Sequence, residues 1–464
     1  MTRGILKIIL VLVVAVFLSV NFAQASEDEL RQEIAALKAK LSEMDAIRAR
    51  VIELEKKLDE QGCAIRTQGS TVQQIRESFV EYKPGEGVKV PPCGIEITAG
   101  ATFVLQGTPN ANNAGDGEAS RFDAAWSADI FIQHHFEEWG LAFMHLEPGQ
   151  GVGVENELSL YSNVNRDQND TGANIPITEL WYEHYLFNRQ IAFTAGKMDP
   201  ANYLDQNAFA HDETTQYIGR IFRQNPAIEW PNDNTIGASL IIAPEILPYL
   251  TFQTSWFDAN NDWEDIFDRP FISAQVNFKP SKAFKLDMEQ WDGNYRFYWW
   301  LNAMDHSKLV GAGESPADNI KNNNYGFGLS FDQMITDTFG AFARFGCERS
   351  DLALASSNSN AAQCEASWSG GLQMTGKYWK RDEDILAFAI GQVFPGKHYK
   401  DVGVANTGGA AEGHLELCYR CRFFKWLAIT PDFQWIWNPH GINHEYLGDA
   451  NTIFVYGVRG QLDF

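Results

Sequence analysis

The chain has 464 residues, a formal net charge of −23 and an aromatic content of 13%. The negative charge argues against nucleic acid as a partner, and the aromatic content argues against an acidic disordered chain. With 38 glycines, and Asn/Asp/Gly clusters between apolar stretches, the composition favours a β-rich exported protein.

Residues 1–25 have the three parts of a secretory signal peptide. Arg3 and Lys7 supply the positive start, residues 8–18 the apolar core, and "AQA" before Ser26 the small-residue cleavage site. A retained membrane anchor is the alternative, but the apolar run is shorter than the ~20 residues that a spanning helix needs. We therefore expect export and cleavage.

Residues 26–62 are predicted to form a coiled coil in the periplasm. They contain no Pro, they carry many charges, and their apolar residues follow the alternating four-three spacing of heptads, with one three-residue slip. These residues are Leu30, Ile34, Leu37, Leu41 and Met44, then Ile47, Val51, Leu54 and Leu58. An amphipathic helix that packs on its own domain is the alternative. Self-association is favoured, with a trimer preferred over a dimer, and residues 63–92, rich in Gly and Pro, are expected to be a linker.

Residues 93–464 are a series of segments with alternating apolar and polar side chains. In 427–437, one parity holds Leu427, Phe433 and Trp435, and the other holds Asp432 and Gln434. A soluble sandwich would bury the apolar face, whereas a membrane barrel turns it towards lipid and lines its lumen with polar groups. Aromatic residues near strand ends, and a final strand that ends on Phe464, favour an all-β transmembrane antiparallel barrel of about sixteen strands.

Several segments resemble one family. Residues 177–240, "DGNYRFYWW" (292–300) and "LAITPDFQWIWNPHG" with the terminal strand (within 415–464) are similar to the carbohydrate-selective outer-membrane porins of the OprB type. The resemblance implies a sixteen-stranded barrel through which sugars diffuse across the outer membrane of a Gram-negative-type cell. The coiled coil is not part of the usual pattern of that family.

The same alternation assigns candidate side chains to the lumen. If Leu180 faces lipid, its neighbours of opposite parity face the lumen, and the same argument applies along the later strands. The candidate pore-lining residues are Glu179, Trp181, Glu183, Arg296, Trp300, Arg344, Glu416, Arg420, Asp432 and Arg459. Arginine can meet two hydroxyls at once with its planar fork. The alternative is that these charges only pair across the wall and hold its shape.

Residues 199–234 are too long and mixed in composition for a hairpin turn. We expect a loop that folds into the lumen and narrows it, and an extracellular flap is the alternative. The candidate constriction residues are Asp199, Asp205, Asn207, Phe209, Asp212 and Glu213.

The even number of cysteines, six, suits a compartment that permits disulfides. Cys347 and Cys364 flank a polar stretch and could pair, and Cys63 with Cys93 is a second candidate pair. "CYRC" (418–421) lacks a second ligand pair, so we expect no metal and no cofactor.

The predicted function is a passive pore for carbohydrates, without catalytic chemistry. The expected partners are carbohydrate solutes, outer-membrane lipid and further copies of the chain, with peptidoglycan as another candidate. One alternative is a structural anchor that the coiled coil tethers to the cell wall. The other is a barrel enzyme that uses Glu179 and Glu183.

Overall fold

The computed structural model describes part of the chain. The described residues are 38, 50, 51, 81–83, 85–90, 94–113, 120–167, 170–172, 174–231, 233–286, 291–306, 323–352, 364–397, 409–441 and 452–464. The predicted signal peptide, most of the predicted coiled coil, Cys63 and Cys93 lie outside them. Within the predicted coiled coil, Lys38, Arg50 and Val51 are helical. The chain divides into two units, Met1–Ser78 and Phe79–Phe464, and every described strand lies in the second.

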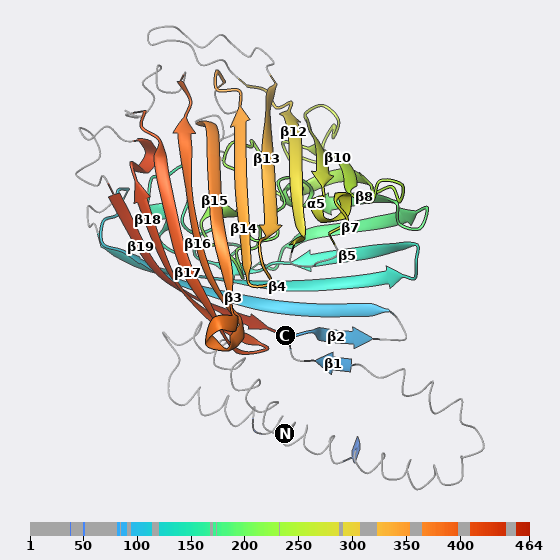
Figure 1. Cartoon of the computed structure of the whole chain (residues 1–464), viewed down its shortest axis with the longest axis horizontal. Helices are drawn as coiled ribbons and strands as arrows, with labels where there is room; N and C mark the ends of the chain where they lie inside the picture. Colours follow the sequence, from blue (N-terminus) through green and yellow to red (C-terminus); the bar gives the residue numbers. More distant parts are fainter. Residues whose placement is uncertain are drawn as a thin grey trace. The chain divides into compact units, whose positions relative to one another are not determined.

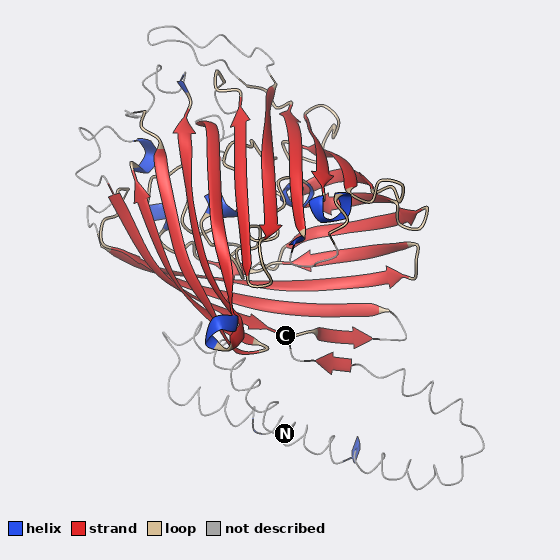
Figure 2. Cartoon of the chain, in the orientation of Figure 1, coloured by secondary structure: helices blue, strands red, loops and turns tan. Residues whose placement is uncertain are grey.

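Antiparallel strands dominate the second unit (Figure 2). Among the described residues, sixteen strands form a closed ring in which each pairs with its two neighbours. They are β3 (Ile95–Thr108), β4 (Arg121–Phe136), β5 (Gly140–Leu146), β7 (Ile177–Leu186), β8 (Ile191–Met198), β9 (Thr235–Ile242), β10 (Leu250–Asp258), β11 (Pro270–Phe278), β12 (Gly293–Asn302), β13 (Asn324–Met334), β14 (Phe339–Glu348), β15 (Cys364–Gly376), β16 (Arg381–Pro395), β17 (Glu412–Phe424), β18 (Leu427–Trp437) and β19 (Thr452–Asp463).

Shorter elements accompany the ring. They are β1 (Glu81–Lys83), β2 (Gly87–Val90), β6 (Gly149–Gln150), η2 (Glu155–Glu157), η3 (Pro200–Tyr203), α4 (Arg220–Arg223), α5 (Pro280–Ala283), η6 (Lys377–Trp379) and η8 (Pro439–Gly441). In the described part of the chain, no helix is both long enough and apolar enough to cross a membrane.

The last strand closes the ring, as its alternation predicts. β19 pairs with β3 from Tyr456 opposite Gly107 to Asp463 opposite Gly100. The backbone N–H of Phe464 then donates a hydrogen bond to the carbonyl oxygen of Ala99 (2.8 Å). A closed ring leaves no strand edge unpaired, which is what a sheet in hydrocarbon requires.

The predicted linker is wrong over residues 81–90. β1 and β2 form a hairpin there, and β2 pairs with the start of β3, so the sheet begins before residue 93. Gly87 permits this approach because it has a φ of +85°, and a Cβ there would lie 2.2 Å from the carbonyl oxygen of Ile97. Gly85 and Gly87, both with positive φ, thus serve a tight turn.

Burial alternates along the strands in the direction expected for a membrane barrel. In β13, Tyr325 and Phe327 are 49% and 58% exposed on the outside, whereas Ser330 and Asp332 are buried on the inside. Apolar side chains outside and polar side chains inside are the reverse of a soluble protein. The sequence prediction of fold class is confirmed.

The two ends of the barrel differ in their connections. At one end turns are short, and Lys425 and Trp426 alone join β17 to β18. At the other end, residues 147–176 join β5 to β7 and residues 199–234 join β8 to β9. β12 to β18 stand side by side as long ribbons in Figure 1, and β3, β4, β5 and β7 form another part of the ring.

Placing a charge on the outer face should destabilise the barrel. Leu329 lies near the middle of β13 with outward parity, so Leu329→Arg should lower the free energy of unfolding from lipid vesicles by about 2–4 kcal/mol. Leu329→Met, which keeps the volume and stays apolar, should cost less than about 1.5 kcal/mol. Equal losses for the two variants would contradict the assignment of this face to lipid.

Candidate functional site

The segment between β8 and β9 lies inside the barrel. Asn207 donates from its side-chain amide to the hydroxyl of Ser330 (3.2 Å) and the carbonyl oxygen of Phe331 (3.1 Å), both on β13. Phe209 packs in a buried cluster with Phe342 on β14. These contacts reach the inward side of the wall, which favours the inserted loop over the extracellular flap.

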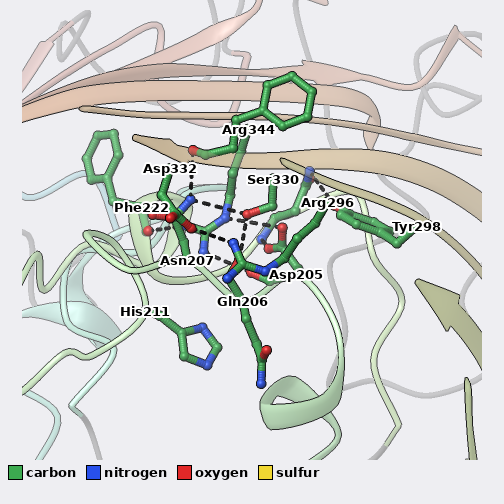
Figure 3. Close-up of polar contacts among 12 residues, drawn as sticks. Asp205, Gln206, Asn207, His211, Phe222, Arg296, Tyr298, Ser330, Asp332 and Arg344 are labelled. Atoms are coloured by element: carbon green, nitrogen blue, oxygen red, sulfur yellow. Dashed lines mark hydrogen bonds and ion pairs between the residues drawn. The ribbon is translucent and has the colours of Figure 1, made fainter. Parts of the chain in front are cut away.

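Arg344 on β14 is the central anchor of this segment (Figure 3). Its Nε donates to Oδ1 of Asp205 (3.1 Å), its Nη2 to the backbone carbonyl of Asp205 (2.9 Å), and its Nη1 to the carbonyl of Phe222 (2.5 Å). The side chains of Arg344 and Asp205 are each 1% exposed. The predicted lining residue Arg344 and the predicted constriction residue Asp205 therefore hold the loop to the wall.

Further wall charges bind the backbone of the same loop. Glu416 on β17 accepts hydrogen bonds from the backbone N–H groups of Ile218 (2.8 Å) and Gly219 (2.9 Å). Arg459 on β19 donates to the carbonyl oxygens of Glu213 (2.5 Å) and Gln216 (2.7 Å). Side chains of the barrel thus satisfy peptide groups that would otherwise be buried without partners.

Arg296 on β12 pairs with Asp332 on β13, and both side chains are buried. Asp332 also accepts a hydrogen bond from the backbone N–H of Ala208 (3.2 Å), so this ion pair belongs to the same junction between loop and wall (Figure 3).

A second segment, 147–176, also enters the barrel, and sequence reasoning did not predict it. The backbone N–H groups of Tyr161 (3.0 Å) and Ser162 (2.8 Å) donate to the carboxylate of Glu412 on β17. The backbone N–H of Arg166 donates to the carbonyl of Ile218 (2.8 Å), which joins the two inserted segments. The length of this stretch and its lack of alternation were signals that could have identified it.

A cavity of about 740 Å³ lies between both inserted segments and the wall formed by β3, β4, β5, β7 and β8. It has polar, charged and aromatic lining. The polar, charged and aromatic residues that border it are Thr98, Asp129, Phe131, Phe143, His145, Glu147, Arg166, Thr171, Thr178, Glu179, Lys197, Asp199, Asn202, His211, Asp212, Glu213, Thr214, Arg223, Asp233, Asn234, Gln461, Asp463 and Phe464.

Four of the predicted site residues border this cavity: Glu179, Asp199, Asp212 and Glu213. The others do not. They are Trp181, Glu183, Arg296, Trp300, Arg344, Glu416, Arg420, Asp432 and Arg459, with Asp205, Asn207 and Phe209 of the loop.

Trp300 and Glu183 are engaged by contacts of their own away from the cavity. Trp300 is fully buried and stacks on Phe271 with ring centres 6.1 Å apart. Glu183 accepts a hydrogen bond from the hydroxyl of Thr194 (2.8 Å), so Glu179 and Glu183 do not converge on one point of the lumen. Arg420 is partly buried on β17.

The β4–β5–β7 wall carries a linked set of polar groups. Nε2 of His145 lies 2.9 Å from Oδ1 of Asp129, and its Nδ1 lies 3.9 Å from Oε1 of Glu179. Glu179 accepts hydrogen bonds from Nε1 of Trp181 (3.2 Å) and from the backbone N–H of Asp199 (3.1 Å). This wall presents carboxylate oxygens and an imidazole to the cavity.

Aromatic rings follow the same strands. Phe143 on β5 lies opposite Trp181 on β7 and stacks on it with ring centres 4.7 Å apart. Phe131 on β4 stacks on Phe143 (5.8 Å) and on His145 (4.4 Å). Phe131 and Phe143 border the cavity, so flat apolar surfaces lie beside the carboxylates. The alternation of β4 and β5 carries the signal for both residues.

Arg223, at the end of α4, brings a cation to the opposite side of the cavity. Its side chain is buried, and its Nε donates to Oε2 of Glu213 (2.7 Å). Its Nη1 has no hydrogen-bond partner within the described part of the chain. A guanidinium that borders a cavity with an unused donor can bind a hydroxyl or an anion there.

Glu147, just after β5, has an altered acidity. Its burial, and then the negative charge of Asp129, raise the pKa of the Glu147 carboxyl to about 7. Candidate ligand atoms of Asp129, His145 and Glu147 lie within 4.8 Å of one another, as do those of Glu416, Cys418 and Asp432. The absence of a metal stays a prediction.

The predicted Cys347–Cys364 disulfide is not formed in this structure, where both thiols are free. Sγ of Cys347 lies 3.9 Å from the carbonyl oxygen of Phe327, and Sγ of Cys364 lies 3.5 Å from Oε1 of Glu348. Cys347 has the outward parity of β14 while Cys364 is buried on the inside, so the polar stretch between them does not bring the sulfurs together. The Cys63–Cys93 pair lies outside the described residues.

Removing the charge of Asp205 should loosen the inserted loop. Asp205→Asn leaves Arg344 buried without its counter-charge, which costs about 3–5 kcal/mol in comparable pairs. The free energy of unfolding should fall, and single-channel current should become noisier as the loop moves. Arg269→Met, which breaks the half-exposed Arg269–Asp305 pair, should cost only about 0–1 kcal/mol. A quiet, stable Asp205→Asn channel would contradict the anchoring role.

Comparison with known proteins identifies the family. The model of the carbohydrate-selective porin, OprB family, matches residues 115–464. The high-pH structure of OprB from Pseudomonas putida is similar, with 14% identity, a TM-score of 0.64, and coverage of 80% of this chain and 95% of that chain.

Two further structures were compared. The low-pH structure of P. putida OprB gives 12% identity and a TM-score of 0.47, over 80% of this chain and 93% of that one. A mutant porin of Rh. blastica gives 10% identity and a TM-score of 0.44, over 80% and 100%. No curated protein matches the chain in sequence.

The high-pH structure of P. putida OprB, with its TM-score of 0.64, supports the fold. The family model supports more, since it covers most of the barrel. The chain belongs to the carbohydrate-selective porin family of the OprB type and is a carbohydrate channel of the outer membrane.

Proposed function

We propose that sugars cross the barrel through the 740 Å³ cavity beside β4, β5 and β7. The observation that carries this proposal is the combination of an aromatic surface, Phe131 and Phe143, with the carboxylates of Asp129 and Glu179 in one lumenal space. The cavity volume lies within the ~300–1,000 Å³ that small-molecule sites usually occupy. An apolar ring surface and converging polar groups match the two faces of a pyranose.

Transport in this proposal is diffusion past weak sites. The apolar face of a sugar ring stacks on Phe143, and its hydroxyls exchange water for Glu179, Asp199 and Nη1 of Arg223. Each such hydrogen bond is worth only about 0.5–1.5 kcal/mol net, so the solute binds and leaves quickly. Conduction requires such shallow binding.

The loop of residues 199–234 narrows the path in this proposal. Asp199, Asp212 and Glu213 border the cavity, and the contacts of Asp205 and Asn207 with the wall support a fixed position for the loop. The end with the short turns is the periplasmic end, because outer-membrane barrels have short periplasmic turns and longer outer connections.

We also propose that residues 26–62 associate in the periplasm, with a trimer as the favoured state. The heptad spacing of their apolar residues supports this. A trimer of coiled coils would join three barrels, and its charged outer face could contact peptidoglycan. The tether is then a second role of the same protein.

Phe143 should contribute directly to sugar binding. Replacing it with Ala removes a stacking surface worth about 0.5–1.5 kcal/mol, so the affinity for glucose should fall about two- to tenfold. The measurement is the concentration dependence of the block of ionic current by glucose. Phe345→Ala is the matched control, because this Phe is 40% exposed on the outside. Equal effects of the two variants would contradict a path along β5.

Deleting residues 26–62 separates transport from tethering. The shortened channel should still pass glucose in a liposome-swelling assay, because the cavity involves only residues from Gly85 onward. Cross-linked trimers and co-sedimentation with peptidoglycan should be lost. Trimers that survive the deletion would show that the coiled coil is not what assembles the protein.

A further inference from the structure

The cavity wall carries far more negative than positive charge. Its lining includes eight carboxyl side chains and three Lys or Arg side chains, which gives 3 − 8 = −5 when histidine is neutral. The carboxyl side chains are Asp129, Glu147, Glu179, Asp199, Asp212, Glu213, Asp233 and Asp463. The basic ones are Arg166, Lys197 and Arg223.

Ion pairs remove only part of this excess. Glu213 is paired with Arg223 (2.7 Å), and Asp463 with Arg422 (3.0 Å), which lies outside the lining. Asp199 also lies 3.9 Å from Nη2 of Arg223, and Asp129 lies 2.9 Å from Nε2 of His145. Acidic residues still outnumber basic residues among those that border the cavity. The excess is therefore a property of the cavity lining and not only of the whole chain.

Three of the remaining carboxyl groups gather on one wall. Asp129 and Glu179 flank His145 at 2.9 and 3.9 Å, and Glu147 follows His145 by two residues. Phe131 and Phe143 lie on the same strands, so a sugar that stacks on these rings places its substituents beside carboxylate oxygens. Clefts lined by one sign of charge focus the field and concentrate counter-ions.

We infer that this acidic wall makes the channel select by charge, favouring sugars that carry an ammonium group over neutral sugars, and neutral sugars over sugar acids. The inference rests on the proposed sugar path. An ammonium group offers three donors and no acceptor, which suits a wall of carboxylates. A sugar acid meets repulsion from the same groups, and the basic residues of the lining, Arg166, Lys197 and Arg223, are too few to offset it.

The test uses the full-length protein in planar bilayers and liposomes. Reversal potentials in a KCl gradient should show preference for K⁺ over Cl⁻. A negative electrostatic potential of only one kT per unit charge in the cavity enriches a monovalent cation about seven-fold over a monovalent anion. Charged clefts reach potentials of several kT. Flux should fall in the order glucosamine, glucose, glucuronate, which are three solutes of similar size.

Variants of the lining carboxyl groups test whether these residues produce the charge selection. Glu147→Gln and Glu179→Gln together should reduce the K⁺ preference and bring the three fluxes closer. Glu245→Gln, the same change at an exposed turn, should alter neither. Should the double variant misfold, the ion preference and the order of the three fluxes in the unaltered protein still decide the matter.

The outcomes are distinct. Equal flux of the three solutes, or anion preference, would overturn charge selection while leaving the sugar path intact. A protein that conducts K⁺ but passes no glucose would instead overturn the proposed path, and the charge selection of sugars with it.

Discussion

The interior of this barrel depends on charged side chains of the wall that bind the backbone of the inserted segments. Arg344 and Arg459 donate to loop carbonyl groups, whereas Glu412 and Glu416 accept from loop N–H groups. Irregular backbone inside a barrel has no sheet or helix to satisfy its peptide groups, and leaving them unpaired is costly. Side chains of the wall supply hydrogen-bond partners for these peptide groups at fixed positions. Two long segments can therefore occupy the lumen with little regular secondary structure of their own.

This arrangement divides the lumen into a packed side and an open side. Buried clusters join the inserted segments to β13–β19, with Phe209 and Tyr217 against Phe342 and Ala389 as one example. Gly340 accommodates Phe209, since a Cβ there would lie 2.4 Å from its ring. The cavity remains on the other side, along β4, β5 and β7. The position of the solute path therefore follows from where the loops are anchored, and the strands that carry most of the lumenal arginines are not the strands that border the open space.

The two kinds of charge in the lumen consequently have different roles. Arg344 donates with all three nitrogens to protein groups. Arg296 is buried and paired with Asp332. Neither residue borders the cavity. Arg223 keeps one unused donor beside the cavity, and the carboxylates of Asp129 and Glu179 keep contact with it. A guanidinium contributes to recognition only where some of its N–H donors remain available to solute. Its contacts with other protein groups determine this, and its inward position on a strand does not.

The sequence by itself determined the class of the fold, the number of strands to a good approximation, and which face of each strand is apolar, because side-chain alternation is a local property of an extended chain. It also identified residues 199–234 as a loop too long for a turn. It did not reveal the hairpin at 81–90, the inserted segment 147–176, the separation of Cys347 from Cys364, or which inward side chains meet open space. Those features depend on contacts between residues far apart in the chain, such as Asp205 with Arg344, and only the closed barrel brings such residues together.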